Sequence, residues 1–307
     1  MFRANVQKKQ TFDGHRDSVY CLTPSRLFPN GFYSAGGDGI VALWNENDET
    51  SAKGILQAPM AIYALCEAGD LLIAGQSDGT LYWVNIKTAT LVKAVKTHRS
   101  SIFDLLFLPE QKWLYACGAE GMISVWDVDT QTCMCQTPVS NDSLRTLHYW
   151  NKQELLFTAG KEQRIFLLSK DAQKILSDRQ AHKGSVFRLT MQGNKLFSVS
   201  RDAHIHVWDT DHLFELEAHP IQSVVAHHYA INDLVFSPDG IFFATGSMDK
   251  TIKIWHADTL QLIKVIDHAR NGGHRSSVNR LIWNENGLIS ASDDAMIYQW
   301  EIICYEV

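Results

Sequence analysis

The chain has 307 residues, 45% apolar and 20% charged, a length that by itself suggests about two domains of roughly 150 residues each. Its 28 Lys and Arg residues against 34 Asp and Glu residues give a formal net charge of −6, which argues against nucleic acid as a partner. No apolar run approaches the roughly 18 residues of a membrane span, and no apolar segment follows the first lysines, so we expect neither membrane insertion nor secretion.

Seven segments fit one template, in which an acidic residue is followed six positions later by a large apolar residue, usually Trp. The acidic residues are Asp38, Asp78, Glu120, Glu162, Asp202, Asp249 and Asp294. The closing residues are Trp44, Val84, Trp126, Leu168, Trp208, Trp255 and Trp300. Successive acidic positions lie 40, 42, 42, 40, 47 and 45 residues apart by subtraction, a period typical of solenoids and propellers. The repeat therefore overrides the length prior of two domains.

Each repeat predicts β-strands in a fixed order. A first strand opens with an apolar residue and carries a Leu three positions later. The opening residues are Val19, Ile62, Ile102, Leu144, Val186, Ile231 and Val278. A second apolar stretch ends in small residues such as Gly36, and a third follows the acidic residue with apolar residues at every second position. A fourth apolar segment follows most closing residues, for example at 90–95 and 260–266, so we expect four strands per repeat.

Over about residues 4–303 these features resemble the WD40 repeat family. Gly14-His15 and Gly273-His274 are literal Gly-His pairs of that family, Trp126-Asp127 and Trp208-Asp209 are literal Trp-Asp pairs, and residues 237–240 read Ser-Pro-Asp-Gly, a common turn between its strands. The resemblance implies an all-β fold, a closed seven-bladed β-propeller of four-stranded antiparallel blades, formed by residues 1–307 as a single domain.

The last repeat, residues 274–303, ends after its third strand and leaves only the short tail 304–307. The chain begins with a spare apolar strand at residues 4–12, just before Gly14-His15. In the family such a strand completes the last blade and closes the ring, which removes exposed sheet edges. We therefore expect residues 4–12 to pair with the strand that ends near Trp300.

The resemblance also implies a buried structural network of His, Ser or Thr, Asp and Trp within the blades. Complete sets are expected in four blades. They are His15, Ser34, Asp38 and Trp44 in blade 1; His182, Ser198, Asp202 and Trp208 in blade 5; His228, Thr245, Asp249 and Trp255 in blade 6; and His274, Ser290, Asp294 and Trp300 in blade 7. These sets look like catalytic Ser-His-Asp combinations, but four copies favour mutual hydrogen bonding over catalysis.

The other three blades depart from this pattern. Blade 3 is partial, because Ala116 stands at the hydroxyl position between His98 and Trp126. Blades 2 and 4 lack both the His and the Trp, with Val84 and Leu168 at the closing position. We expect apolar packing to hold blades 2 and 4.

In the family, the residue after each opening apolar residue points toward one mouth of the central channel. These residues are Tyr20, Tyr63, Phe103, Arg145, Phe187, Asn232 and Asn279. The residue before each acidic position faces the same surface, and in blade 7 it is Asp293. Four aromatic residues among seven predict a partner-binding site, since exposed aromatic patches commonly mark one. The alternative is that the aromatic rings only plug a narrow channel.

We predict no cofactor and no metal. The 13 histidines fix no set of ligands at metal-binding spacing, although His204 and His206 share one face of a strand. The six cysteines form no disulfide framework, and Cys133-Met-Cys135 lacks a second Cys or His pair. Free thiols in a reducing, cytoplasmic compartment are the expectation.

The leading hypothesis is a non-enzymatic interaction module or scaffold that presents the channel mouth to one or more protein or peptide partners, with a partner's Lys or Arg as the anchor. Aromatic faces and Asp293 would attract such a cation, whereas Arg145 would repel it. The alternative is an enzyme that uses the channel as its pocket, with Arg145, Asp104, Asp233 and Asp293 as loose candidates. Recognition of RNA or a ubiquitin-like protein is a third hypothesis, and no concentrated basic stretch supports the RNA version.

Overall fold

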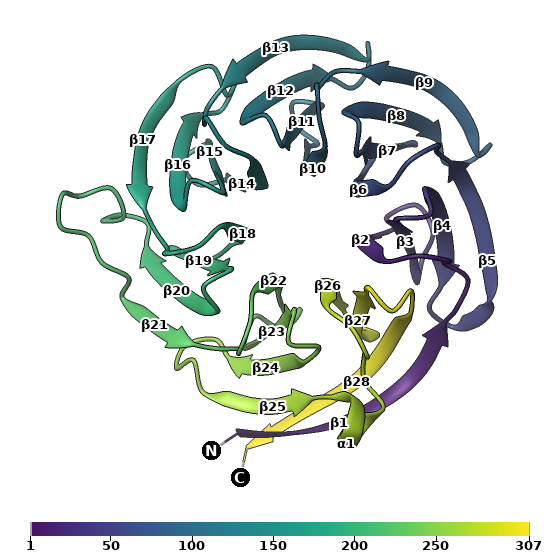
Figure 1. Ribbon diagram of the computed structural model, residues 1–307, viewed down its shortest axis with the longest axis vertical. Coiled ribbons are helices and arrows are strands. Elements are labelled where there is room, and N and C mark those ends of the chain that lie inside the picture. Colours follow the sequence, from purple (N-terminus) through teal and green to yellow (C-terminus); the bar gives the residue numbers. More distant parts are fainter. Residues whose placement is uncertain (1, 307) are drawn as a thin grey trace. The chain divides into compact units, whose positions relative to one another are not determined.

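The computed structural model describes residues 2–306, apart from the side chains of residues 49 and 51. Within that range, β-strands make seven four-stranded antiparallel sheets, and α1 (His268–Asn271) is the only helix. Figure 1 shows the strands of each sheet in order. The seven sheets match the seven predicted repeats, so we call them blades 1 to 7. The strands divide between two compact units, residues 1–61 with 226–307 and residues 62–225.

Unit 1 holds blades 1, 6 and 7. Blade 1 consists of β2 (Val19–Pro24), β3 (Gly31–Gly36), β4 (Ile40–Asn45) and β5 (Asp48–Gln57). Blade 6 consists of β22 (Ile231–Phe236), β23 (Phe242–Ser247), β24 (Ile252–His256) and β25 (Leu262–Ile266). Blade 7 consists of β26 (Val278–Asn284), β27 (Gly287–Ser292), β28 (Ile297–Glu306) and β1 (Phe2–Phe12). Within this unit, the first strand of blade 7 contacts the first strands of blades 1 and 6.

Unit 2 holds blades 2 to 5. Blade 2 consists of β6 (Ile62–Ala68), β7 (Leu71–Gln76), β8 (Thr80–Asn85) and β9 (Thr90–Lys96), and blade 3 of β10 (Ile102–Leu108), β11 (Trp113–Gly118), β12 (Met122–Asp127) and β13 (Thr132–Pro138). Blade 4 consists of β14 (Leu144–Trp150), β15 (Leu155–Gly160), β16 (Arg164–Ser169) and β17 (Ile175–Gln180), and blade 5 of β18 (Val186–Gln192), β19 (Lys195–Ser200), β20 (His204–Asp209) and β21 (Gln222–Val225). The first strands of successive blades contact one another in this unit too.

The N-terminal strand β1 pairs antiparallel with β28, from Phe2 opposite Glu306 to Phe12 opposite Ile297. The two strands lie side by side in Figure 1. Both strands are longer than the sequence indicated, because β1 begins at Phe2 and β28 runs through residues 304–306. Residue 307 of the predicted tail lies outside the described residues. The paired strand leaves β28 without an open edge in blade 7.

The hydrophobic core lies between neighbouring blades, because the middle strands bury the side chains of both faces. β11 illustrates this, since Leu114 packs against blade 2 residues while Tyr115 packs against blade 4 residues. A fully buried large apolar side chain contributes about 1.5 to 3 kcal/mol. The small residues that end the second strands let the backbone of the first strand approach closely. In blade 4, a Cβ on Gly160 would lie 1.9 Å from the carbonyl oxygen of Ser143, the residue just before the first strand.

Candidate binding surface

The seven residues predicted to face the mouth occupy one structural position, the extra residue of a β-bulge in the first strand of each blade. In blade 3, for example, the pairing of β10 with β11 shifts register between Ile102 and Asp104. The extra residues are Tyr20, Tyr63, Phe103, Arg145, Phe187, Asn232 and Asn279. A bulge re-aims its side chain and is frequent next to functional sites. All seven side chains remain partly exposed.

In unit 2 four of these residues contact one another, and we call Tyr63, Phe103, Arg145 and Phe187 the bulge cluster. The guanidinium carbon of Arg145 lies 4.0 Å from the ring centroid of Phe103 and 5.7 Å from that of Phe187. The ring centroids of Tyr63 and Phe103 are 5.7 Å apart. The chain's own guanidinium therefore makes the cation–π contacts that the sequence analysis reserved for a partner's Lys or Arg.

In unit 1 the bulge amides bond to neighbouring blades. Asn232 Nδ2 donates to Ser277 Oγ at 2.8 Å, which joins blade 6 to blade 7. Asn279 Nδ2 donates to the carbonyl oxygen of Val19 at 3.0 Å, which joins blade 7 to blade 1, and also to Asp293 Oδ1 at 2.7 Å. Asp293 remains exposed. These amides serve packing between blades, and Asp293 keeps an accessible carboxylate.

Asp104 and Asp233, considered for the enzyme alternative, lie one residue beyond the bulge and are buried. Asp104 Oδ2 accepts the backbone N–H of Leu147 in the next blade at 2.8 Å, and the guanidinium of Arg188 lies 3.6 Å away. Asp233 accepts the backbone N–H of Leu281 at 2.8 Å in the same way. Both carboxylates therefore link adjacent blades within their units. This is a structural role, and it does not indicate a general acid or base.

The in-register His, hydroxyl, Asp and Trp residues meet inside the blades. In blade 5, His182 Nε2 lies 2.8 Å from Ser198 Oγ, which also accepts the Trp208 indole N–H at 2.9 Å. His182 Nδ1 lies 3.1 Å from Asp202 Oδ2. The same contacts join His15, Ser34, Asp38 and Trp44 in blade 1, and His274, Ser290, Asp294 and Trp300 in blade 7.

In blade 6 the assignment of His228 to this network is wrong, because the imidazole comes from His227. His227 Nδ1 lies 2.9 Å from Asp249 Oδ2 and its Nε2 lies 2.7 Å from Thr245 Oγ1. His228 is exposed and contributes only its backbone N–H, to Asp249 at 3.2 Å. The sequence spacing identifies the correct residue. In the other blades with this network the His lies four residues before the opening apolar residue, and counting back four from Ile231 gives His227.

Blade 3 contains a network that the sequence analysis treated as incomplete. Ser124 Oγ lies 2.9 Å from His98 Nε2 and accepts the Trp126 indole N–H at 3.0 Å. Glu120 Oε1 lies 2.9 Å from His98 Nδ1. Ser124 stands directly opposite Ala116 in the β11–β12 pairing. The hydroxyl therefore comes from the third strand rather than the second.

Blades 2 and 4 have other residues at these positions. Ala58 and Ser140 stand where the other blades have His, and the closing residues Val84 and Leu168 are buried. In blade 4, Thr158 Oγ1 donates to the backbone carbonyl of Thr146. Apolar packing and backbone hydrogen bonds replace the network there.

Four stretches of the chain, residues 6–45, 89–127, 218–256 and 265–301, match the family described as WD domain, G-beta repeat, and together they make up about half of the chain. The chain belongs to the WD40 repeat family. The family resemblance stated from the Gly-His and Trp-Asp pairs is thereby confirmed.

Several proteins are similar to this WD40 chain along most of its length. Striatin-3 of Mus musculus is 21% identical over 92% of this chain and 39% of its own length, and Striatin-4 of Homo sapiens is 20% identical over 96% and 43%. The chain thus spans about two fifths of the length of these striatins. The Target of rapamycin complex subunit wat1 of Schizosaccharomyces pombe is 23% identical over 75% of both chains.

Among solved structures, the WD40 beta propeller domain of Doa1 matches with a TM-score of 0.84, covering 97% of both chains at 18% sequence identity. At this identity the likeness shows the fold. The predicted all-β, seven-bladed propeller of four-stranded antiparallel blades is confirmed.

The network carboxylates of Asp294 and Asp202 are more acidic than an ordinary Asp side chain. Burial by itself raises the pKa of Asp294, but the hydrogen bond and charge of His274 and the backbone N–H groups of Arg275 and Met296 lower it to about 2. The pKa of Asp202 is also lowered, because His182 and backbone N–H groups outweigh the effect of burial. The carboxylates are therefore ionised at neutral pH and hold their imidazoles in place.

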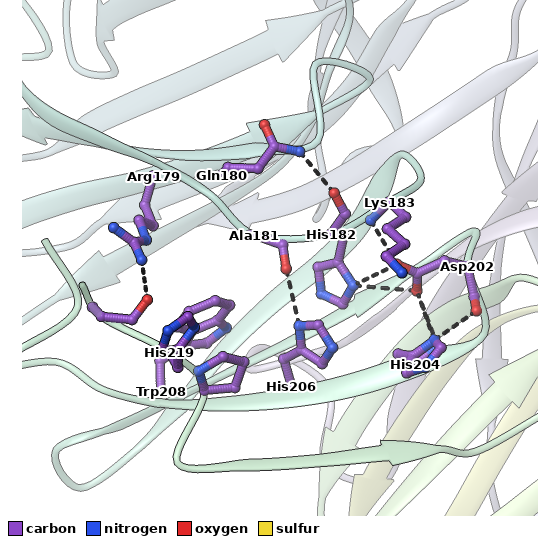
Figure 2. A pocket seen from close by; sticks show the side chains of 12 residues that line it. Arg179, Gln180, Ala181, His182, Lys183, Asp202, His204, His206, Trp208 and His219 are labelled. Atoms are coloured by element: carbon purple, nitrogen blue, oxygen red, sulfur yellow. Dashed lines mark hydrogen bonds and ion pairs between the residues drawn. The ribbon is translucent and has the colours of Figure 1, made fainter. Parts of the chain in front are cut away.

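A pocket of about 360 Å³ lies between the fourth strand of blade 4 and the third strand of blade 5. Figure 2 shows the imidazoles of His182 and His206 within it, stacked with centroids 4.2 Å apart. His206 Nδ1 donates to the carbonyl oxygen of Ala181 at 2.9 Å. Burial and the neighbouring His182 lower the pKa of His206 to about 4, so this ring is neutral at neutral pH. Arg179 donates to the carbonyl oxygen of Glu215 at 3.0 Å and holds the loop beside the pocket.

The remaining sequence features add no further site. No group of three or more His, Cys, Asp and Glu side chains in the described part of the chain is arranged to hold a metal ion. All six cysteines are free thiols, and Cys133 Sγ lies 3.5 Å from the carbonyl oxygen of Cys135. Across residues 2–306, no helix is long and apolar enough to cross a membrane.

Proposed function

We propose that this WD40 propeller is a non-enzymatic interaction module, which holds one or more protein or peptide partners against its bulge residues. The observation that carries the proposal is the bulge cluster. Three aromatic rings and a guanidinium project from one repeated position, contact one another and remain partly exposed. Aromatic and Arg side chains of this kind dominate the binding energy of protein interfaces.

The cluster fits a binding surface better than a plug of the channel. A plug needs only apolar volume, whereas the cluster places a charged group among its rings. The similar proteins agree with an assembly role, since one is described as a subunit of a target of rapamycin complex. The proposal assigns no catalytic residue, because Asp104 and Asp233 already bind backbone N–H groups.

Three finer points belong to the same proposal. A Lys or Arg side chain of a partner would bind at Asp293, whose exposed carboxylate is oriented by Asn279 at 2.7 Å. Residues 1–307 would act as a single domain, in which β1 completes blade 7. The six free thiols fit a reducing, cytoplasmic compartment.

The test is affinity purification with the wild type and the Phe103→Ala/Phe187→Ala variant. Loss of a central aromatic anchor commonly lowers affinity by about 2 kcal/mol or more, roughly thirtyfold. Leu91→Ala is the matched control, because Leu91 is 52% exposed but lies on the fourth strand of blade 2. Equal melting temperatures of the three proteins establish that the fold is intact. Retention of every partner at unchanged affinity by the double variant contradicts the proposal.

A further inference from the structure

Arg145 is a cation without a counter-charge among the residues that the structure describes. Its Nε atom is buried and has no hydrogen-bond partner, and no ion pair to Arg145 is formed within residues 2–306. Its contacts are the ring faces of Phe103 and Phe187. Burial lowers the pKa of the Arg145 guanidinium, although such a group stays charged at neutral pH.

Two other cations near the bulges of unit 2 have acidic partners. The Arg188 guanidinium in blade 5 lies 3.6 Å from Asp104. The Lys161 ammonium in blade 4 lies 2.7 Å from Asp142. Arg145 lacks an acidic partner of this kind in the part of the chain that the structure describes.

A buried charge is costly unless an opposite charge accompanies it. Cation–π contacts of the kind that Arg145 makes offset only part of that cost. A planar guanidinium is also the side chain best suited to bind a carboxylate or a phosphate through two parallel hydrogen bonds. An oxyanion that binds Arg145 would supply the negative charge that no described residue of the chain provides there.

The charges around the cluster favour an anion. The other bulge residues of unit 2 are uncharged aromatics. The buried carboxylate of Asp104, one residue beyond the Phe103 bulge, lies 3.6 Å from the Arg188 guanidinium and accepts the backbone N–H of Leu147. The turn residues that precede the acidic positions of blades 4 and 5 are cations, Lys161 and Arg201. Their backbone N–H groups bond at 2.8 Å to Ser143 and Ser185, each two residues before a bulge. Arg201 therefore adds positive charge on blade 5, whereas Asp142 offsets the charge of Lys161 on blade 4.

We propose that Arg145, held between Phe103 and Phe187, binds a carboxylate or phosphate group of the protein segment that docks on the bulge cluster. This inference rests on the proposed function and specifies the chemistry of the partner at this point. Phe103 and Phe187 position the guanidinium, and its outer nitrogens donate to the oxyanion. The partner segment carries an acidic or phosphorylated residue next to a side chain that packs on the rings.

The experiment follows the Nε–H resonance of Arg145 by NMR in the full chain labelled with ¹⁵N-arginine, assigned by its loss in Arg145→Lys. Sodium acetate is the carboxylate probe and sodium phosphate the phosphate probe, each compared with sodium chloride at equal ionic strength. We expect a saturable shift with at least one oxyanion and none with chloride. Tighter binding of acetate identifies an acidic side chain as the ligand group, and tighter binding of phosphate identifies a phosphorylated one.

Arg145→Lys keeps the charge but loses the planar fork, so it weakens oxyanion binding by about tenfold, followed through the backbone amides of Phe103 and Phe187. Arg145→Met abolishes binding. Arg201→Met is the matched control, because it removes a nearby cation and keeps Arg145. A wild-type titration in which neither oxyanion shifts the resonance beyond the chloride control overturns the inference. If the Phe103→Ala/Phe187→Ala variant still loses its partners in that case, the proposed function stands and only the anion chemistry fails.

Discussion

Ser124 stands directly opposite Ala116 across β11 and β12, and its hydroxyl binds the rings of His98 and Trp126. In blades 1, 5, 6 and 7 a hydroxyl of the second strand binds the corresponding His and Trp rings. Blade 3 thus keeps its polar network although the expected position holds Ala. The two positions are within reach of the same rings because they are paired across the strands.

We predict that Ser124→Ala lowers the free energy of unfolding by about 1 to 3 kcal/mol, because two buried ring nitrogens lose their partner. Ala116→Ser in the Ser124→Ala background restores part of the loss, since it returns a hydroxyl from the second strand. Urea denaturation of the single and double variants measures both effects. A double variant no more stable than Ser124→Ala would show that the two positions are not equivalent.

The neighbouring histidines of blade 6 provide a matched pair. His227→Ala removes the imidazole bound to Asp249 and Thr245, so we expect a loss of about 1 to 3 kcal/mol in the free energy of unfolding. His228→Ala changes it by no more than about 0.5 kcal/mol, because that side chain is exposed. Equal losses in the two variants would contradict the assignment of His227.

The N-terminal strand should be required for a monomeric protein. A chain that begins at Gly14 exposes the edge of β28 and loses the buried ring of Phe12, which packs on Phe32 and Trp44. We expect a lower melting temperature and association that increases with protein concentration, measured by light scattering. A chain that begins at Asn5 keeps most of β1 and serves as the control. If the chain that begins at Gly14 were monomeric with an unchanged melting temperature, β1 would not be needed to protect the edge of β28.

Acid should weaken the network in a defined range. The pKa of Asp294 is about 2 in the folded protein against an ordinary value of 3.8, so folding favours its ionised form. Its contribution to stability is therefore complete above about pH 4 and is lost as the pH falls through about 2. Asp294→Asn should flatten the pH dependence of the free energy of unfolding in that range. An unchanged profile in the variant would mean that Asp294 does not carry this linkage.

The strand order and seven repeats were predictable because each strand has an alternating apolar pattern and each turn recurs in register. The seven residues at the bulges could be located in the sequence, since each follows an opening apolar residue such as Ile102, but the bulges themselves were not predicted. Ser124 was not, because its role depends on pairing with Ala116 across strands rather than on its place in the repeat. The misassigned His228 shows that loop lengths between His and Asp vary, whereas the spacing from His227 to the next strand does not.

The stacking of Arg145 on Phe103 could not be predicted from the sequence either. The two residues are on adjacent blades, and their contact depends on how the first strands pack. From the sequence we expected the aromatic faces to bind a partner's cation, but the packed bulges bring the chain's own guanidinium to Phe103 and Phe187. The pocket beside His206 has the same origin, because it joins side chains from blades 4 and 5 with the loop before β21.

Site-specific photo-cross-linking tests whether a partner docks on the bulge residues. A benzophenone amino acid is placed at Tyr63, a bulge position of blade 2, and in a second protein at Leu91, on the fourth strand of the same blade. Irradiation of each protein with its purified partner is followed by mass spectrometry of the cross-linked peptides. We expect a cross-link from position 63 and none from position 91. A cross-link from position 91 alone would show that the partner docks away from the bulge residues.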